Sequence, residues 1–195
     1  KDIPAELTDG SVDIAFLAAG SDHAVAIDTE NNFYFWGNTR LRQDQYESNS
    51  ELNMALRRGD LEIKQLEAGN QFSIILDTAG NVYLWGNPSG NELDCRDKER
   101  IEEGEDKEPR QYQGNIEKVA VTDHSYIALL KDGTVAYTGY EKDNALNTNL
   151  PVELTDGSVR VVDIASTSQN VAAIDENGKI WVWGVSTRNE KNVPE

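Results

Sequence analysis

Short runs of β-branched and aromatic residues recur along the chain, and each run ends on a glycine. Three of them read FYFWG, VYLWG and IWVWG, at residues 33–37, 82–86 and 180–184. A fourth run, VAYTG at 135–139, carries Thr138 where the other three carry tryptophan. Runs of this length and composition, bounded by turn residues, are typical of β-strands. The glycines are spaced 49, 53 and 45 residues apart, which indicates a repeat.

The similarity between the units extends upstream of these runs without a gap. The matching segments are IAFLAAGSDHAVAIDTEN (14–31), IKQLEAGNQFSIILDTAG (63–80), IEKVAVTDHSYIALLKDG (116–133) and VVDIASTSQNVAAIDENG (161–178). Each segment contains two further apolar runs separated by turn residues, so each unit predicts at least three strands. The turn before the last strand carries glycine or asparagine, which supplies the positive φ that a tight hairpin needs.

A segment that precedes each unit predicts a fourth, outer strand. IPAELTDGSV (3–12) recurs as LPVELTDGSV (150–159), and its proline suits an edge strand because the missing N–H costs nothing there. NMALRRGDL (53–61) fits the same frame. Local propensity instead favours a capped helix over 48–59, because serines precede a run of good helix formers and a glycine follows it. Since propensity is a weak prior, we follow the repeat and expect a strand at 53–56.

Four-stranded units of this length are the signature of propeller blades. We therefore predict an all-β fold, a β-propeller built from four-stranded antiparallel blades, with four blades visible. The chain would form one partial propeller over 1–195. Its repeat units would span roughly 3–52, 53–108, 109–149 and 150–195.

The segment AAGSDHAVAIDTENNFYFWGN (18–38) resembles the repeat of the regulator-of-chromosome-condensation (RCC) family, which runs Ala-Gly-x-x-His, an apolar strand, a turn glycine and a Trp-Gly pair. The divergent units are as similar to short bacterial repeats, such as the propeller-type β-lactamase inhibitor. The chain departs from the pattern where His23 is replaced by other residues in later units, and where Gly20 and Gly69 give way to threonine. The resemblance implies a larger propeller of about seven blades, and partners that are proteins.

The ends of the chain add to this expectation. The sequence begins with Lys1 rather than methionine, and a new outer-strand segment begins at 192–195. The outer strand of the repeat completes the preceding blade, and residues 3–7 have no preceding blade within the chain. We therefore expect an open arc in which residues 3–7 are unpaired, with the remaining blades supplied by the same or another chain.

Most of the recurring residues are predicted to be structural. Tryptophans at one repeat position would pack between neighbouring blades rather than serve as ligand platforms, and Trp181 shares their face of the strand. We expect His23 to be a hydrogen-bonded structural group and His124 to lie exposed in a turn. The structural repeat positions are Gly20, Trp36, Gly37, Gly69, Trp85, Gly86, Gly139, Trp183 and Gly184.

Composition narrows the function classes. The chain holds 35 acidic against 18 basic residues, a net charge of −17, which disfavours nucleic acid because the phosphate backbone is repelled. No apolar run is long enough for a transmembrane helix. We expect no metal and no cofactor, because calcium-loop and phosphate-loop motifs are absent from the sequence. The single cysteine, Cys95, and the absence of a usable Asn-x-Ser/Thr acceptor favour the cytoplasm.

We expect a non-enzymatic module that binds protein through loops on one propeller face. The candidate anchors follow Trp-Gly positions and should lie on the same side of the blades; they are Arg40, Arg42, Tyr46, Tyr112 and Tyr140. The charged run 94–114 is either a solvated loop or a protruding contact loop. Two alternatives remain open. One is a guanine-nucleotide exchange factor for a small GTPase, and the other is a structural block of a virion, tail or surface assembly.

Overall fold

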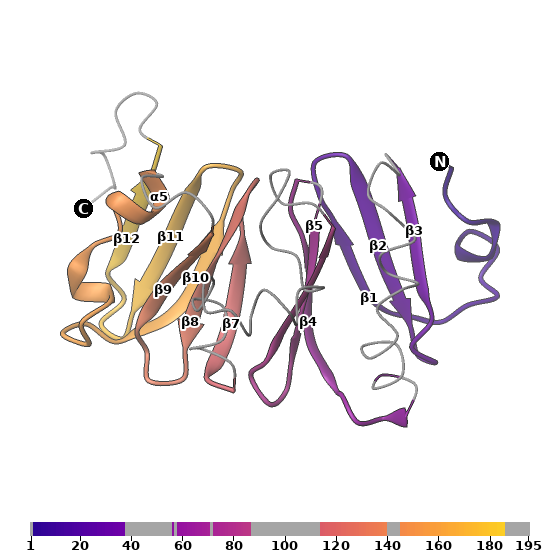
Figure 1. The fold of residues 1–195 in the computed structure, drawn as a ribbon, viewed down its shortest axis with the longest axis horizontal. Coiled ribbons are helices and arrows are strands. Elements are labelled where there is room, and N and C mark those ends of the chain that lie inside the picture. Colours follow the sequence, from indigo (N-terminus) through magenta and orange to yellow (C-terminus); the bar gives the residue numbers. More distant parts are fainter. Residues whose placement is uncertain are drawn as a thin grey trace, which may run out of the picture. The chain divides into compact units, whose positions relative to one another are not determined.

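The computed structural model describes residues 2–37, 56, 58–70, 72–86, 114–139 and 145–185. The chain divides into two compact units, Lys1–Gly114 and Asn115–Glu195, and each unit holds two sheets (Figure 1). All four sheets are antiparallel, and in each the strands are paired in chain order. The helices among the described residues are short, so the predicted all-β class is confirmed.

The first unit contains six strands. Its first sheet comprises β1 (Ile14–Ala19), β2 (His23–Asp28) and β3 (Phe33–Gly37), and its second comprises β4 (Ile63–Ala68), β5 (Phe72–Asp77) and β6 (Val82–Gly86). The second unit repeats the pattern with β7 (Ile116–Val121), β8 (Ser125–Leu130) and β9 (Val135–Gly139), and then β10 (Val161–Ser166), β11 (Asn170–Asp175) and β12 (Ile180–Gly184). Between the last two sheets lie a short helix, α5 (Ala145–Thr148), and the 3₁₀ helix η2 (Val152–Leu154).

The repeat is confirmed down to the register of the strands. The first strand of every sheet pairs with the second through the same irregularity, which follows its first residue: Ile14, Ile63, Ile116 and Val161. The hairpins between the second and third strands also match. The predicted turn residues there take positive φ, 65° at Asn31, 95° at Gly80 and 88° at Gly133. The backbone geometry therefore follows the repeat that the sequence predicts.

The predicted outer strands are wrong, and among the described residues each sheet has three strands rather than four. The segment after Pro4 forms the 3₁₀ helix η1 (Ala5–Leu7), and η2 is its counterpart after Pro151. Leu56 and Arg58 are helical, which contradicts the strand expected at 53–56 where the structure describes it; residues 53–55 lie outside the described residues. At Leu56 and Arg58 the helix that local propensity favours is therefore the better interpretation.

The reason is local hydrogen bonding. The Leu7 N–H donates to the Pro4 carbonyl at 3.1 Å, and both the N–H and the Oγ1 of Thr8 donate to the carbonyl of Ala5. These bonds satisfy backbone groups that an outer strand would have offered to a sheet. Residues 4–8 thus bond to one another, as do the equivalent residues after Pro151.

Each unit has its core between its two sheets. We call the side of a sheet that carries Leu66 or its repeat equivalents the front, and the side that carries Ile27 or its equivalents the back; alternate residues of a strand point to opposite sides. In the first unit the back of the first sheet packs against the front of the second, and the third and fourth sheets pack in the same way. The buried residues of the two cores are Val25, Ile27, Leu56, Leu61, Leu66 and Ile75, and Ala120, Ile127, Leu129, Val135, Leu146, Leu154, Val161, Ile164, Val171, Ala173 and Trp183.

Candidate functional site

The two ends of each sheet differ in the connections between strands that are found there. His23 pairs with Gly37, and the three other sheets show the same pairing between the start of the second strand and the glycine that ends the third. The segments that follow the Trp-Gly positions therefore leave each sheet at the end where the first and second strands are joined. We call this the loop end of the sheet.

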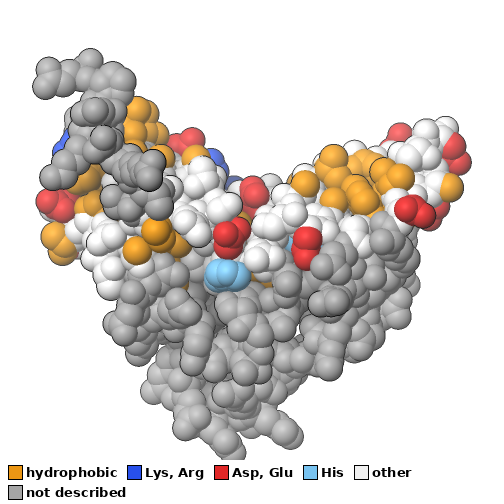
Figure 2. Space-filling model, turned by 90° about the horizontal axis from the view of Figure 1, so that it is seen from above, with side chains coloured by type: hydrophobic (Ala, Val, Ile, Leu, Met, Phe, Trp, Pro, Cys, Tyr) orange, Lys and Arg blue, Asp and Glu red, His pale blue; other side chains and the backbone are white. Residues whose placement is uncertain are grey.

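The predicted anchors belong to these segments. Arg40, Arg42, Tyr46, Tyr112 and Tyr140 all lie outside the described residues, so their role stays a prediction. The described turns at the loop end are short and polar, and their exposed residues include Ser21, His124 and Ser168. Figure 2 shows acidic side chains and a histidine among the described residues, with hydrophobic side chains beside them. The described turns at the loop ends are thus polar, and the longer segments begin beside them.

His23 stands beneath the loop end as a structural group, as predicted. Its ring is buried, and Nε2 lies 2.8 Å from the Oγ of Ser73 on β5, which ties the first sheet to the second. The Nδ1 lies 3.5 Å from a carboxylate oxygen of Asp22. Burial lowers the pKa of His23, although the Asp22 carboxylate opposes that shift. A neutral, buried ring between two sheets holds the scaffold together, whereas His124 is exposed in its turn, as predicted.

The close approach of the first two sheets explains Gly20, and another pair of residues takes the same two positions in the third sheet. A Cβ added to Gly20 would stand 2.1 Å from the Gly69 carbonyl oxygen and 2.9 Å from Cε1 of His23. In the third sheet the same two positions carry Thr122 and Ser125, whose hydroxyls lie 2.7 Å apart. Gly20 thus lies next to the His23 ring in the first sheet, and Thr122 lies next to the smaller Ser125 in the third.

Among the tryptophans that the structure describes, Trp183 and Trp181 contribute to a core. Trp183 is buried in the core of the second unit, and its Nε1 donates to the Leu146 carbonyl at 3.0 Å. Trp181 packs against the same core, while Trp36 is half-buried. The side chain of Trp85 lies outside the described residues. The glycines Gly86 and Gly139 end β6 and β9, where Gly37 and Gly184 end β3 and β12.

The position after these tryptophans requires glycine for two reasons. Gly37 has φ 97° and Gly184 has φ 139°, a region that other residues rarely adopt. A Cβ at Gly184 would also stand 2.3 Å from the Gln169 carbonyl oxygen. Backbone conformation and close contact therefore explain these repeat glycines.

An aspartate at the opposite end of the sheets was not singled out by the sequence reasoning. Asp28 Oδ1 accepts hydrogen bonds from the N–H groups of Glu30 and Asn32, each at 2.8 Å, and Oδ2 accepts from Asn32 Nδ2 and Tyr34 Oη. Burial opposes ionisation of Asp28, but these hydrogen bonds outweigh it, so its pKa lies below the usual range. The recurrence of aspartate in this alignment column was the signal that would have found it.

The same arrangement closes two other hairpins. Asp77 accepts from the Asn81 N–H at 2.7 Å and from Tyr83 Oη at 3.1 Å. Asp175 accepts from the Lys179 N–H and from Trp181 Nε1, both at 3.0 Å. The hydrogen bond from Trp181 is the main reason why the pKa of Asp175 is lowered. These carboxylates are saturated by their own hairpins, so their role is to fix the scaffold.

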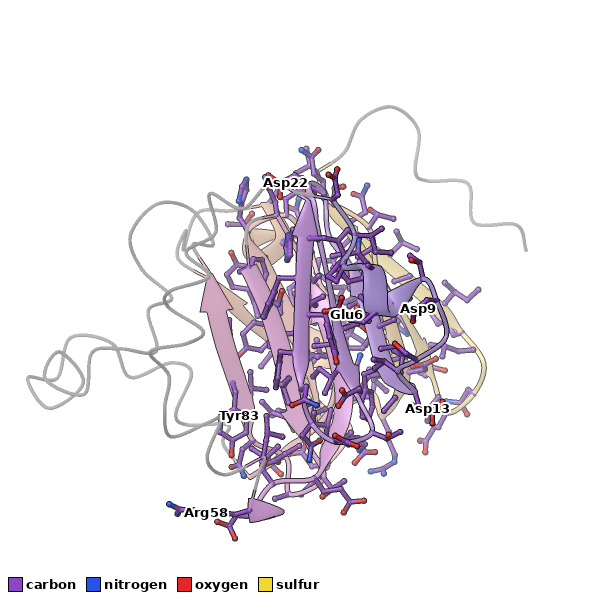
Figure 3. The ribbon with its side chains drawn as sticks, turned by 90° about the vertical axis from the view of Figure 1, so that its right-hand side faces the viewer. Glu6, Asp9, Asp13, Asp22, Arg58 and Tyr83 are labelled. Carbon is purple, nitrogen blue, oxygen red and sulfur yellow. The ribbon has the colours of Figure 1, made fainter. Side chains whose placement is uncertain are left out.

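Acidic residues also surround the first sheet. Figure 3 shows Glu6 and Asp9 beside its strands, with Asp22 in the turn at the loop end. The Glu6 carboxylate contributes to the raised pKa of Tyr34, after burial and the neighbouring Asp28. Within the described ranges, no group of histidine, cysteine and acidic side chains is arranged to hold a metal ion. No helix in the described part of the chain is long and apolar enough to cross a membrane.

Comparison with known proteins identifies the fold. No family model and no curated protein matches the chain. Among solved structures, yeast RCC1 (Prp20) bound to Kap60 is 21% identical with a TM-score of 0.58, over 88% of this chain and 43% of that one. The CRINKLY WD40 ectodomain of the Arabidopsis thaliana receptor kinase ACR4 is 13% identical with a TM-score of 0.56, over 88% and 50%. The C-terminal domain of gp131 from bacteriophage phiKZ is 11% identical with a TM-score of 0.54, over 93% and 56%.

These likenesses concern the fold alone, because every identity is low. The chain spans about half the length of the structures that it matches. Four antiparallel three-stranded sheets in the register of a blade repeat, together with these neighbours, show that the chain has the fold of a partial β-propeller.

Proposed function

We propose that the chain is a non-enzymatic protein-binding module of RCC type, and that it binds through the segments at the loop end of its sheets. The observation that carries the proposal is the strand register. In every sheet the glycine that ends the third strand pairs with the first residue of the second strand. Every long connection after a Trp-Gly position therefore starts beside a short, polar turn.

The scaffold beneath these segments supports a binding role. His23 and Ser73 connect two sheets near the loop end of the first unit, and the Ser166 hydroxyl donates to the Val121 carbonyl at 2.5 Å in the second. At the opposite end, saturated aspartates close three hairpins. Loops held on a rigid scaffold are a common basis of recognition, because function lies in the loops and not in the fold.

Two structures of one neighbour, yeast RCC1 (Prp20), suggest the kind of partner. One structure contains yeast RCC1 with Kap60, and another study of Prp20p concerns its binding to Gsp1p and histones. For this chain we propose a protein partner with a basic surface, because a net charge of −17 would steer such a partner toward it. The Tyr46, Arg40 and Arg42 side chains would supply the anchors of the first loop, since tyrosine and arginine are enriched among binding hot spots.

The test has two stages. Proteins retained by the immobilised chain are identified, and the affinity of each purified candidate is then measured by biolayer interferometry. A triple variant, Arg40→Ala with Arg42→Ala and Tyr46→Ala, should raise Kd by at least about tenfold, as expected for the loss of hot-spot residues. The matched control is the double variant Thr29→Ala with Glu176→Ala. Both residues are exposed, and each lies at the end of its sheet that is opposite the loop end.

The control should leave Kd within about twofold, the effect of residues outside an interface. Equal losses in both variants, or a loss in the control alone, would refute the assignment to the loop end. Nucleotide release from a panel of small GTPases is measured in parallel. Clear acceleration by the chain would favour the exchange-factor alternative over a passive binding module.

A further inference from the structure

The front of the first sheet exposes residues that its counterparts bury. Leu17 on β1 is 65% exposed, whereas its repeat equivalents Leu66 and Ile164 are 7% and 2% exposed. Ile14 is also exposed, whereas its equivalent Val161 is buried. The buried equivalents belong to fronts that pack against the back of the preceding sheet. The front of the first sheet thus has apolar residues like those of a sheet-to-sheet junction, but they are exposed.

The back of the fourth sheet shows the complementary exposure. Ile180 on β12 is 50% exposed, whereas its equivalent Val135 is 3% exposed. Ile174 is exposed where Ile27 and Leu129 are buried, and Val182 beside it is exposed as well. The buried equivalents pack against the front of the following sheet. This face is therefore the other half of the same kind of junction.

The chain already joins a back to a front in both units. In the first unit, Val25 and Ile27 of the first sheet share a core with Leu66 and Ile75 of the second. In the second unit, Ile127, Leu129 and Val135 share a core with Ile164 and Val171. The pairing rule is thus that aliphatic side chains of a back meet aliphatic side chains of a front, with aromatic side chains beside them in both cores. The back of the fourth sheet meets the first half of that rule with Ile174, Ile180 and Val182. The front of the first sheet meets the second half with Ile14 and Leu17.

We propose that the occupant of each exposed face is a second copy of this chain, with the back of the fourth sheet of one copy seated on the front of the first sheet of the next. The contact is head-to-tail, so it generates rings or open chains and not two-fold dimers. It continues the junctions within the units, and burial of large aliphatic side chains drives it. The proposal is independent of the loop-end function, because it uses the faces of two sheets.

Charge opposes this association. Each copy carries a net charge of −17, and Glu6, Asp9 and Asp13 lie around the first sheet (Figure 3). Repulsion between copies is screened as ionic strength rises, whereas the burial of aliphatic side chains persists. Association should therefore strengthen from low to moderate salt.

Two variants with complementary blocks test the orientation. Leu17→Glu places a charge on the front of the first sheet, and Val182→Glu places one on the back of the fourth. Both side chains are exposed in the structure, so both variants should fold, which circular dichroism checks. Val152→Glu, at an exposed residue of η2 outside both faces, is the matched control. Masses are measured by sedimentation and light scattering from about 1 µM to about 1 mM, the range in which weak complexes dissociate.

The wild-type chain and Val152→Glu should associate, and each of the two blocked variants alone should be a monomer. An equimolar mixture of the blocked variants should form a 1:1 dimer that grows no further, because one intact front meets one intact back. A monomeric wild-type chain at all concentrations and salts would overturn the proposal. So would association of either blocked variant alone at wild-type strength, which indicates a two-fold contact, or a mixture that stays monomeric. If either variant fails to fold, Ile14→Glu or Ile180→Glu replaces it on the same face.

Discussion

At the scale of the residue, one carboxylate organises the hairpin between the second and third strands in three sheets. Asp28, Asp77 and Asp175 each accept a hydrogen bond from the N–H four residues later and one from an aromatic side chain six residues later. The third sheet has Leu130 at this position, and Asp132 bonds to Thr134 within its turn instead. Three hairpins are thus closed by a buried charge, and one by a turn residue at the surface.

Replacement of Asp77 by alanine should destabilise the fold by about 3 kcal/mol, because charged hydrogen bonds are lost and buried donors are left without an acceptor. The donors are the Asn81 N–H, Asn81 Nδ2 and Tyr83 Oη. Urea denaturation gives the free energy of unfolding. Asp132→Ala, at an exposed turn residue, should cost less than about 1 kcal/mol. Equal losses in both variants would show that burial of the carboxylate adds nothing.

The Tyr83 hydroxyl should titrate late. Burial raises the pKa of Tyr83 to about 12, with further contributions from the Asp77 charge and hydrogen bond. A raised pKa means that the folded chain favours the neutral phenol, so this stabilisation is complete below about pH 10 and is lost as pH rises toward 12. Ultraviolet titration of the wild type against Tyr83→Phe isolates the residue. A phenol that ionises near pH 10 in the folded chain would contradict this expectation.

The sequence allowed some of these residues to be assigned and not others. His23 and Trp183 stand at positions where the repeat itself requires packing, so their structural role follows from the alignment. Asp28 was passed over because acids are abundant in this chain, and abundance hides a position that recurs for a reason. The partners of Asp28 lie two to six residues away, so the hydrogen bonds become visible only when the turn is built.

At the scale of the element, 3₁₀ helices lie where the repeat led us to expect outer strands. Pro4 and Pro151 have φ of −55° and −61°, and the threonine four residues later bonds back to the first turn. The sequence contained this signal twice, in the repeated ELTDGS. The expected architecture of a four-stranded blade favours an outer strand at the same place. Local bonding decided the conformation, because nothing in the residue pattern of these segments compels pairing to a sheet.

The 3₁₀ segments nevertheless contribute to the core, to different extents. Leu154 of η2 is fully buried in the second unit, whereas its repeat equivalent Leu7 of η1 is half-buried. We expect Leu154→Ala to cost about 3 kcal/mol and Leu7→Ala about 1 kcal/mol, in proportion to the buried area lost. Thermal and urea unfolding of the two variants measure the difference. Equal costs would mean that η1 is as well packed as η2.

The junction between the first two sheets depends on Gly20. Gly20→Ala should destabilise by about 3 kcal/mol, because a Cβ at 2.1 Å from a backbone oxygen forces the sheets apart. Gly178→Ala is the matched control, since its Cβ would meet open space and only the positive φ is penalised, at about 1 kcal/mol. Unfolding in urea with tryptophan fluorescence detects both. A cost at Gly20 no larger than at Gly178 would refute the tight junction.

At the scale of the whole molecule, charge is the dominant feature. A net charge of −17 on 195 residues destabilises the compact state through self-repulsion, and added salt screens this repulsion. The melting temperature of a dilute sample should therefore rise between about 10 mM and about 300 mM sodium chloride, as the screening length falls. Potassium and choline chlorides should act alike. An effect confined to one cation would indicate ion binding instead of screening.

The four sheets, the order of the three strands that each contains among the described residues, and the hairpin turns followed from the sequence at this scale, because a repeat is visible without coordinates. The binding anchors did not. Tyr46 and Tyr112 were selected for residue type and for their position after a Trp-Gly pair. That position indicates at which end of a sheet a segment starts, but it does not indicate what the side chains of that segment contact. A loop has no periodic pattern from which its conformation follows, and its partner leaves no trace in the repeat.

The carboxylates that close the hairpins also affect the exchange of amide protons with solvent. The tips of β-hairpins usually exchange fast, since their N–H groups face water. Here the N–H groups of Asn32, Asn81 and Lys179 donate to aspartate oxygens, although Asn32 and Lys179 are exposed and Asn81 is half-buried. Deuterium uptake at these tips should then report the opening of the hairpin itself. The exchange rate of these turn amides would then be set by the slow opening of the sheets and not by the fast motions of a loop.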